Sequence, residues 1–170
     1  MKSQQKQNCQ SFLPNIDEKS EILILGSMPG MKSLKEQQYY AHPQNRFWKL
    51  MELFCNVENL QDFDYQEKLQ TLLKNKIALW DVIQVCNREG SLDSNIQNEI
   101  PNNIPKLLKN FPNIKYICLN GNKAYSAFKK HFSELLKQYK CYKLPSTSPA
   151  NARYKLDDLY QEWQQALFQA

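Results

Sequence analysis

The segment that decides the fold is EILILGSMPG, residues 21–30. Its first half is a continuous apolar run, which is typical of a strand covered on both faces in a parallel sheet. Gly26, Pro29 and Gly30 then end the run, because glycine and proline are the strongest breakers of regular structure. Glycine also lets a ligand approach the backbone closely, and proline stiffens the turn. A strand followed by such a turn indicates a binding site more than a plain connection.

Further strands and helices alternate along the chain. Apolar runs predict strands at residues 77–83, 114–119 and 141–144. Helical spacing of apolar side chains predicts helices at residues 47–57, 65–73, 104–111, 123–132 and 156–168, and Pro105 suits a first helical turn. The alternation predicts an α/β fold: a three-layer α/β/α sandwich with a central four-stranded parallel sheet.

Length and composition set the expected domain organisation. The 170 residues are enough for one domain, expected at residues 20–170, and the polar, Gln-rich start predicts a flexible N-terminal tail over residues 1–19. No apolar run reaches membrane length, and the N-terminus lacks the apolar core of a secretion signal. We therefore expect an intracellular, cytoplasmic monomer without membrane contact.

The cysteines and histidines argue against a metal or redox centre. The five cysteines are scattered without a CxxC pair, so we expect reduced thiols, mostly in the core. Two histidines, His42 and His131, are too few for a histidine-based metal site. We expect neither metal nor cofactor. The net charge of +5 permits a polyanionic partner without demanding one.

Each predicted strand ends in a distinctive loop. The loops are residues 26–30, 81–93, 120–122 and 145–151, and they contain all four glycines of the chain. Parallel strands place such ends on one rim of the sheet, where ligands bind in folds of this kind. Glycines also mark ordinary turns, so connectivity alone stays open as an explanation, but four such loops favour a site.

In this order the loops resemble those of the uracil-DNA glycosylase superfamily, over residues 21–168. Residues 26–30 resemble its Gly-x-Asn-Pro-Gly turn, which holds a water. HPQNRFW at residues 42–48 resembles the following loop of the mismatch-specific branch. LWDV at residues 79–82, with RxGS at 88–91, resembles the base-recognition strand of the family. LNGN at 119–122 resembles the end of its third strand, and LPSTSP at 144–149 resembles the loop that presses into the DNA minor groove.

One departure from the superfamily pattern narrows the branch. Position 28 is Met, where many relatives carry a catalytic Asn or Asp. Together with YYAHP at residues 39–43, it resembles the hypoxanthine-DNA glycosylase branch. The resemblance implies that the protein hydrolyses the N-glycosidic bond of a deaminated base flipped out of DNA and leaves an abasic site. The base would be hypoxanthine, with uracil or xanthine as further possible substrates. No lysine lies in a motif position, which argues against a Schiff-base lyase step and for a monofunctional glycosylase. The resemblance also implies association with the nucleoid.

The breaking bond needs a positioned water or a stabilised charge. We expect Asn45 to position the water, although an amide is too weak a base to deprotonate it. The alternative is that Asn45 caps a helix that begins at Arg46. His42 is a candidate contact to the leaving base, or a structural histidine beside Pro43.

The flipped base must be stacked and read. Tyr40 and Phe47 are candidate stacking faces, although aromatic side chains are more often core residues. Asp81 would accept a ring N–H, which hypoxanthine carries at N1 and adenine lacks; uracil carries one at N3, so Asp81 does not separate these two. Alternatively, Asp81 caps a loop or pairs with Arg88. The full expected base-binding set is Gly26, Ser27, Met28 (through its backbone), Tyr40, Asp81 and Asn120, where Asn120 alternatively only tolerates a left-handed turn.

The DNA strand must also be gripped at its phosphates. We expect Ser146, Thr147 and Ser148 to offer hydroxyls, with charge from Arg153 and Lys155 on the same edge. A Ser/Thr-rich turn beside a solvated arginine is the alternative.

Two other functions stay open from the residues alone. Met28 supports a non-catalytic nucleic-acid-binding module on the same fold. A small-molecule α/β enzyme is the weaker possibility, because the first motif has neither a phosphate-loop lysine nor a dinucleotide-binding fingerprint.

Overall fold

The central sheet is built around β2, Ile22–Gly26, in a computed structural model that describes residues 7–168. Every residue of β2 is buried, and alternate side chains serve opposite faces: Leu23 and Leu25 enter one core, and Ile22 and Ile24 the other. Parallel partners flank it in the strand order β3-β2-β6-β7. The partners are β3 (Ile77–Asp81), β6 (Tyr116–Asn120) and β7 (Lys140–Leu144).

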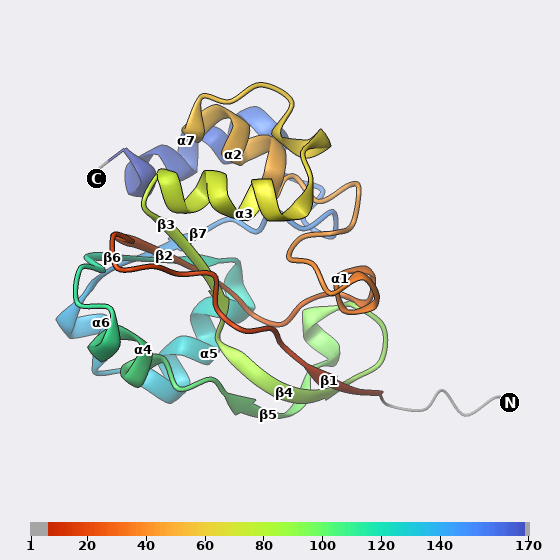
Figure 1. The fold of residues 1–170 in the computed structure, drawn as a ribbon. Coiled ribbons are helices and arrows are strands. Elements are labelled where there is room, and N and C mark those ends of the chain that lie inside the picture. Colours follow the sequence, from red (N-terminus) through yellow and green to blue (C-terminus); the bar gives the residue numbers. More distant parts are fainter. Residues whose placement is uncertain (1–6, 169–170) are drawn as a thin grey trace, which may run out of the picture.

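Helices cover both faces of this sheet (Figure 1). One layer contains α2 (Phe47–Cys55), α3 (Tyr65–Lys74) and α7 (Leu156–Leu167). The other contains α4 (Ile104–Asn110), α5 (Asn122–Phe132) and the short α6 (Leu135–Gln138). Pro105 lies in the first turn of α4, where the side chain of Asn103 accepts a hydrogen bond from the N–H of Lys106 at 3.2 Å. The predicted three-layer α/β/α sandwich with a four-stranded parallel sheet is confirmed.

A second, antiparallel sheet was not predicted. It has the order β1-β4-β5, with β1 at Gln7–Gln10, β4 at Ile83–Arg88 and β5 at Gln97–Pro101. The expected strand at 77–83 therefore ends at Asp81, and part of the expected polar loop over residues 81–93 is β4. The polar side chains of Gln84, Asn87 and Arg88 hide the strand in the sequence, although Ile83 and Cys86 enter the core. Backbone pairing on both sides adds to its stability.

The expectation of a flexible tail over residues 1–19 is wrong for residues 7–19. β1 pairs along β4, and Asn15 forms a two-way backbone bridge with Leu79 at 2.9 Å in each direction. The indole N–H of Trp80 also donates to the carbonyl of Phe12 at 2.9 Å. These contacts run through backbone groups, which a polar composition does not reveal. Residues 1–6 of the expected tail lie outside the described part of the chain.

Short elements complete the chain. The helix α1, Met31–Glu36, follows the first turn, and single 3₁₀ turns lie at η1 (Leu60–Asp62) and η2 (Asp93–Asn95). None of the helices within residues 7–168 combines the length and apolar character needed to cross a bilayer. Four of the five cysteines are buried and Cys141 is half-buried.

Shortening the central strand's core side chain tests this account of the sheet. Ile24 is completely buried, so Ile24→Ala should lower the free energy of unfolding by about 2–5 kcal/mol. Leu13 is 87% exposed, so Leu13→Ala should change it by less than about 0.5 kcal/mol. Denaturant unfolding of both variants makes the comparison; equal losses would contradict the central position of β2.

Candidate active site

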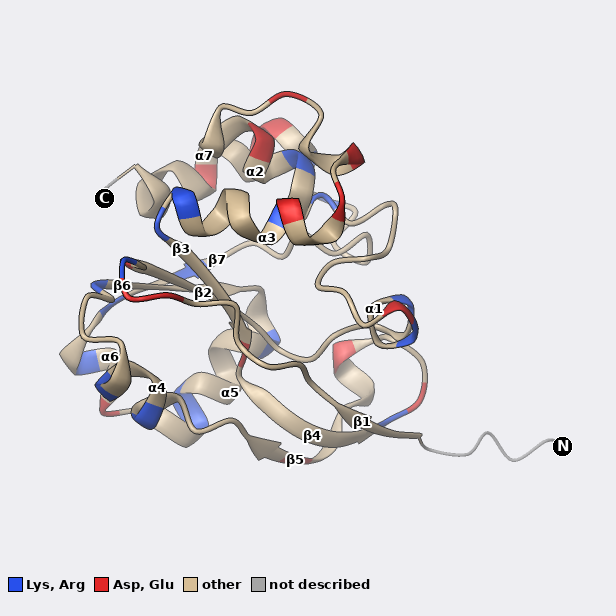
Figure 2. Ribbon diagram, in the orientation of Figure 1, with Lys and Arg blue, Asp and Glu red and all other residues tan. Residues whose placement is uncertain are grey.

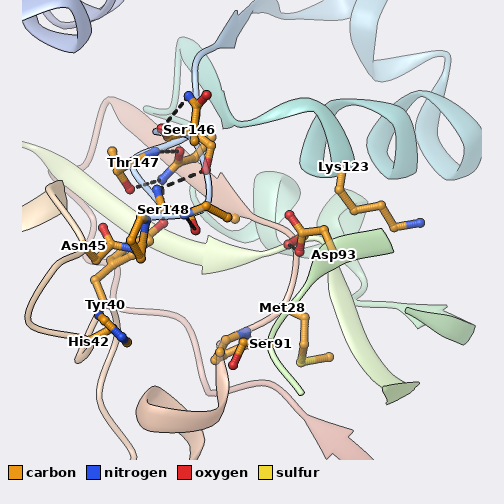
Figure 3. A pocket seen from close by; sticks show the side chains of 18 of the residues that line it. Met28, Tyr40, His42, Asn45, Ser91, Asp93, Lys123, Ser146, Thr147 and Ser148 are labelled. Carbon is orange, nitrogen blue, oxygen red and sulfur yellow. Dashed lines mark hydrogen bonds between the residues drawn. The ribbon is translucent and has the colours of Figure 1, made fainter. Parts of the chain in front are cut away.

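One cavity of about 810 Å³ lies beyond the carboxyl ends of β2, β3, β6 and β7. Residues far apart in the sequence line it, and Figure 3 shows several of them from close by. Every predicted site residue is among those that line the cavity: Gly26, Ser27, Met28, Tyr40, Asn45, Asp81, Asn120, Ser146, Thr147, Ser148 and Arg153. The predicted convergence of the four strand-end loops, with Asn45 and Asp81 in one hollow, is confirmed.

Gly26 and Asp81 form the base of the cavity. They pair across β2 and β3, and a Cβ on residue 26 would lie 2.6 Å from Oδ1 of Asp81 and 3.3 Å from the Tyr40 hydroxyl. Glycine is therefore required here by close approach. Met28 follows in the turn, 6% exposed, and its side chain belongs to the core beneath the second sheet.

The carboxyl group of Asp81 is 4% exposed, and its Oδ2 has no hydrogen-bond partner. Burial, followed by the charge of Asp93, raises the pKa of Asp81 to about 7, against the opposing charge of Arg88. Arg88 forms no ion pair with it; its Nη2 donates to the carbonyl of Pro29 at 2.5 Å. The alternative that Asp81 simply pairs with Arg88 is therefore wrong. A buried oxygen without a partner is unusual in a native protein, and on a residue that lines the cavity it marks Asp81 as a candidate ligand contact.

Tyr40 is backed by Phe47. Their rings stack with centroids 3.9 Å apart and an interplanar angle of 22°. Phe47 is fully buried, so the expectation that its face could stack a base is wrong, because Tyr40 covers it. Burial raises the pKa of the Tyr40 hydroxyl above its usual range, so this group keeps its proton and remains a donor.

Asn120 and Thr147 fasten two parts of the rim together. Nδ2 of Asn120 donates to the hydroxyls of Tyr40 at 3.2 Å and Thr147 at 3.1 Å, and its Oδ1 accepts the N–H of Thr147 at 3.0 Å. Both amide hydrogens of Asn120 are thus used within the protein, which leaves only acceptor capacity for a ligand. Thr147 has no exposed surface, so the expected phosphate contact by its hydroxyl is wrong. The left-handed conformation lies at Gly121, φ +100°, and not at Asn120.

Arg46 is a structural residue of the site that the sequence analysis missed. Its guanidinium donates to backbone carbonyls of the loop at residues 145–151, through Nε to Thr147 at 3.3 Å and through Nη2 to Ser148 at 2.7 Å. It also donates to the carbonyls of Asn151 and Tyr154. The planar fork of arginine suits such multiple contacts. Its place beside Asn45 in the HPQNRFW cluster was visible in the sequence, but the partners more than 100 residues away were not.

The other predicted DNA contacts remain accessible. Ser146 and Ser148 are half-buried, and Arg153 is exposed. The hydroxyl oxygens of the two serines accept backbone N–H groups, from Ser148 at 3.1 Å and from Ala150 at 3.2 Å. Neither O–H group donates a hydrogen bond within residues 7–168, so both can donate to an anion.

Asn45 is half-buried on the same side of the pocket as Tyr40 and His42 in Figure 3. Its Oδ1 accepts the N–H of Phe47 at 3.0 Å, so it does help to begin α2, although Arg46 is the residue that directly precedes that helix. The Nδ2 group makes no hydrogen bond within the described chain and is available to the cavity. The exposed His42 accepts the N–H of Gln44 through Nδ1 at 3.1 Å.

Further charged residues of the cavity also escaped the sequence analysis. Asp93 is exposed as a residue, but its carboxyl accepts the Ser27 hydroxyl at 2.6 Å, and desolvation of that carboxyl raises its pKa against the opposing effects of Ser27, Arg88 and Lys123. Lys123 and Lys143 also line the cavity, although neither stands in a recognised motif position. In the described chain, no group of three His, Cys, Asp or Glu side chains is arranged to hold a metal ion.

The buried carboxyl of Asp81 should make stability depend on pH. Its folded pKa of about 7 lies above the ordinary value of 3.8, so the native state keeps a proton that the unfolded state has lost between these values. Stability should therefore fall as pH rises from about 4 to about 7. Asp81→Asn removes this loss. Its free energy of unfolding relative to wild type should therefore be higher at pH 8 than at pH 5, by roughly 2–4 kcal/mol.

Thermal and denaturant unfolding at both pH values measures the gain. Asp157→Asn, which changes an exposed carboxylate in the first turn of α7, is the matched control and should show no such pH trend. A gain for Asp81→Asn that is equal at both pH values would contradict the raised pKa.

Comparison with known proteins places this site in a family. The model of the Uracil DNA glycosylase superfamily matches residues 13–168. A protein of Methanosarcina acetivorans named Hypoxanthine DNA glycosylase is 45% identical over 141 residues, which are 82% of this chain and 85% of the relative. One of Methanosarcina barkeri with the same name is 46% identical over 115 residues, 68% of this chain and 72% of the relative.

A solved structure agrees with the sequence relatives. The solution NMR structure of a candidate uracil DNA glycosylase from Methanosarcina acetivorans superposes with a TM-score of 0.82 at 40% identity, and covers 95% of this chain and 97% of its own. The resemblance inferred from the motifs is confirmed, including the branch. The chain therefore belongs to the uracil-DNA glycosylase superfamily, within its hypoxanthine-DNA glycosylase branch, and is a DNA glycosylase.

Proposed function

We propose that this protein removes hypoxanthine from DNA by hydrolysis of the glycosidic bond and leaves an abasic site. The observation that carries the proposal is the buried, unpartnered Oδ2 of Asp81 at the base of a cavity lined by Tyr40 and Asn45. The names of the two Methanosarcina relatives support the choice of base. The cavity is complete within one chain, which supports action as a monomer.

The cavity suits a base that has left the helix stack. Its volume of about 810 Å³ lies within the range of small-ligand sites, which is enough for a nucleoside. Tyr40 offers a ring held rigid by the stack on Phe47, and base–aromatic stacking stabilises a bound base by about 1–3 kcal/mol. Extrusion is least costly for a mispaired base, which favours deaminated bases over normal ones.

Asp81 reads the edge of the base. With a pKa of about 7, Asp81 is partly ionised at neutral pH. The ionised form accepts the N1–H of hypoxanthine, whereas adenine presents an acceptor at N1 and would leave two acceptors facing each other. Uracil and xanthine also carry ring N–H groups, so Asp81 accounts for preference for deaminated bases as a class. The base then leaves after Asn45 has oriented the water through its free Nδ2 group.

The three cavity lysines, Lys32, Lys123 and Lys143, are not expected to form a Schiff base. Nζ of Lys32 is paired with Oε1 of Glu36 at 2.8 Å. Nζ of Lys123 is paired with Oε1 of Glu99 at 2.7 Å, and an ion-paired ammonium is not a nucleophile. Nζ of Lys143 lies 5.1 Å from the ring centroid of Tyr125, a contact that also favours the charged form. The proposal is therefore a monofunctional glycosylase.

The charge that meets DNA comes from the cavity rim. Figure 2 shows Lys and Arg distributed over both helical layers, so the net charge of +5 is not collected on one element. Arg153, Lys32 and Lys143 line the cavity together with the two accessible serines. Salt should weaken binding, because phosphate contacts release counterions.

A lesion panel tests the function. Duplex and single-stranded DNA with one inosine, uracil, xanthine or mismatched thymine is incubated with excess enzyme, and abasic sites are cleaved by alkali. We expect product from inosine, no strand cleavage without alkali, and no adduct after borohydride treatment. Binding to inosine DNA without base release would instead favour the non-catalytic module, and adduct formation would contradict the monofunctional mechanism.

Asn45→Ala tests the role of the amide. Loss of a positioned water should lower the single-turnover rate on inosine DNA by about 100-fold or more. Because Asn45 also accepts the N–H of Phe47, Asn45→Asp and Asn45→Ser keep that acceptor as controls for stability. Wild-type rates in Asn45→Ala would contradict the assignment.

Asp81→Asn tests base reading. An amide can present either an acceptor or a donor, so the ratio of rates on inosine and adenine should narrow by about tenfold or more. The single-turnover rates on both bases in otherwise identical duplexes give this ratio. An unchanged ratio would contradict a role for Asp81 in base selection.

A further inference from the structure

The loop between β4 and β5 brings Asp93 against the first turn. Three contacts hold it there: the Ser27 hydroxyl donates to Oδ1 of Asp93 at 2.6 Å, the N–H of Met31 donates to the Ser91 hydroxyl at 2.9 Å, and Arg88 binds the carbonyl of Pro29. Figure 3 shows Asp93 and Lys123 on a different side of the pocket from Asn45 and Tyr40. Asp93 is therefore a fixed carboxylate beside residue 28, with no task assigned so far.

We propose that Asp93 is the catalytic carboxylate of this enzyme, which faces the sugar, stabilises its developing positive charge and accepts the proton of the attacking water. The inference rests on the proposed glycosylase reaction and adds to it the group that carries negative charge.

The chemistry requires such a group. Cleavage of a glycosidic bond develops oxocarbenium character on the sugar, which an anion stabilises in a partly dry cavity. The side chain of Met28 has no carboxyl or amide group that could serve, and the amide of Asn45 orients water but does not accept its proton. A carboxylate supplies both the charge and the base.

Three carboxylates line the cavity: Asp81, Asp93 and Glu162. Asp81 lies on the floor of the cavity, 4% exposed, and so close to β2 that residue 26 has no room for a side chain. This position suits a contact to the edge of the nucleobase and not to the sugar. Glu162 and Asp93 are both exposed residues, but no hydrogen bond fixes the side chain of Glu162 within the described residues. Asp93 alone of the three is held by a hydroxyl from the turn at residues 26–30.

The charge of Asp93 is not committed to another ion. It forms no ion pair with any Lys, Arg or His side chain in residues 7–168. The nearby Lys123 is bound instead to Glu99, whose second oxygen lies 3.0 Å from Nε2 of His131. Glu99 thus compensates Lys123 and leaves the Asp93 carboxylate available to the sugar cation.

The proposed step balances within substrate, water and carboxylate. The C1′–N9 bond breaks and its electron pair leaves with the base. The water oxygen then forms a bond to C1′, and one water proton passes to the free oxygen of Asp93. That proton moves on to the departing base or to solvent, which regenerates the carboxylate.

Asp93→Asn tests the proposal, with Glu89→Gln as the matched control. Glu89 lies on the same loop, outside the cavity, and its replacement removes the same charge. Single-turnover rates are measured on the lesion that the wild type processes best. Asp93→Asn should lose about 100-fold or more, as expected for a lost general base, and Glu89→Gln should stay within about twofold of wild type.

Binding separates a chemical role from a structural one. Asp93→Asn should bind a duplex with a tetrahydrofuran abasic analogue at least as tightly as wild type, because a negative charge near DNA has been removed. Added formate should restore the rate of Asp93→Ala by about tenfold, since it returns a carboxylate to the vacated space. A rate loss with equally weakened binding, or no response to formate, would overturn the proposal.

The outcomes distinguish the two proposals. An active wild type with Asp93→Asn within about threefold of its rate overturns the role of Asp93 and leaves the glycosylase function standing. A wild type that releases no base from any lesion overturns both. If Asp93→Asn does not fold, Ser27→Ala decides: loss of the fixing hydroxyl should lower the rate by about tenfold at unchanged binding, and an unchanged rate overturns the proposal.

Discussion

The cavity depends on one close approach between neighbouring strands. The register of β2 and β3 pairs Gly26 with Asp81, and the carboxyl oxygen occupies the space that a side chain on residue 26 would take. Because the approach buries the carboxyl, it also raises its pKa into the neutral range. One glycine therefore decides where the acidic group lies, how dry it is and in which protonation state it meets a ligand.

The second sheet extends this constraint to the rest of the turn. The chain that leaves β3 stays hydrogen-bonded to this turn. The N–H of Val82 donates to the carbonyl of Gly26 at 2.8 Å, and the N–H of Ile83 donates to the carbonyl of Ser27 at 3.1 Å. It continues as β4 into the loop that returns Asp93 to Ser27. β1 supports β4 from its other edge, so the N-terminal residues stabilise the site although they lie outside it. Strand, turn and loop act as one unit, and a carboxylate on a loop gains the fixed position that catalysis requires.

The sequence predicted the central sheet and the convergence of its loops, because buried parallel strands read as apolar runs and their carboxyl ends must meet. It did not predict β1 or β4, because the few side chains that they place in the core stand among polar ones and the rest of their stabilisation is backbone pairing. The sequence also predicts a DNA contact by Thr147, because nothing local shows that Asn120 binds it and that it is buried. Arg46 and Asp93 were missed because their partners are distant in the chain, and single-sequence patterns carry spacing but not distance.

Position 28 shows how the charge in the cavity is limited. Met28 is buried in the core below the turn, where a carboxylate would have been desolvated. A third acid beside Asp81 and Asp93 would also raise the pKa of both, since like charges in one cavity oppose each other's ionisation. Arg88 favours the ionised form of both Asp81 and Asp93, and Lys123 favours that of Asp93 although it is paired with Glu99. An apolar residue at position 28 therefore leaves Asp81 and Asp93 able to ionise. In the proposed mechanism the acidic group lies on the loop between β4 and β5 and not in the turn at residues 26–30.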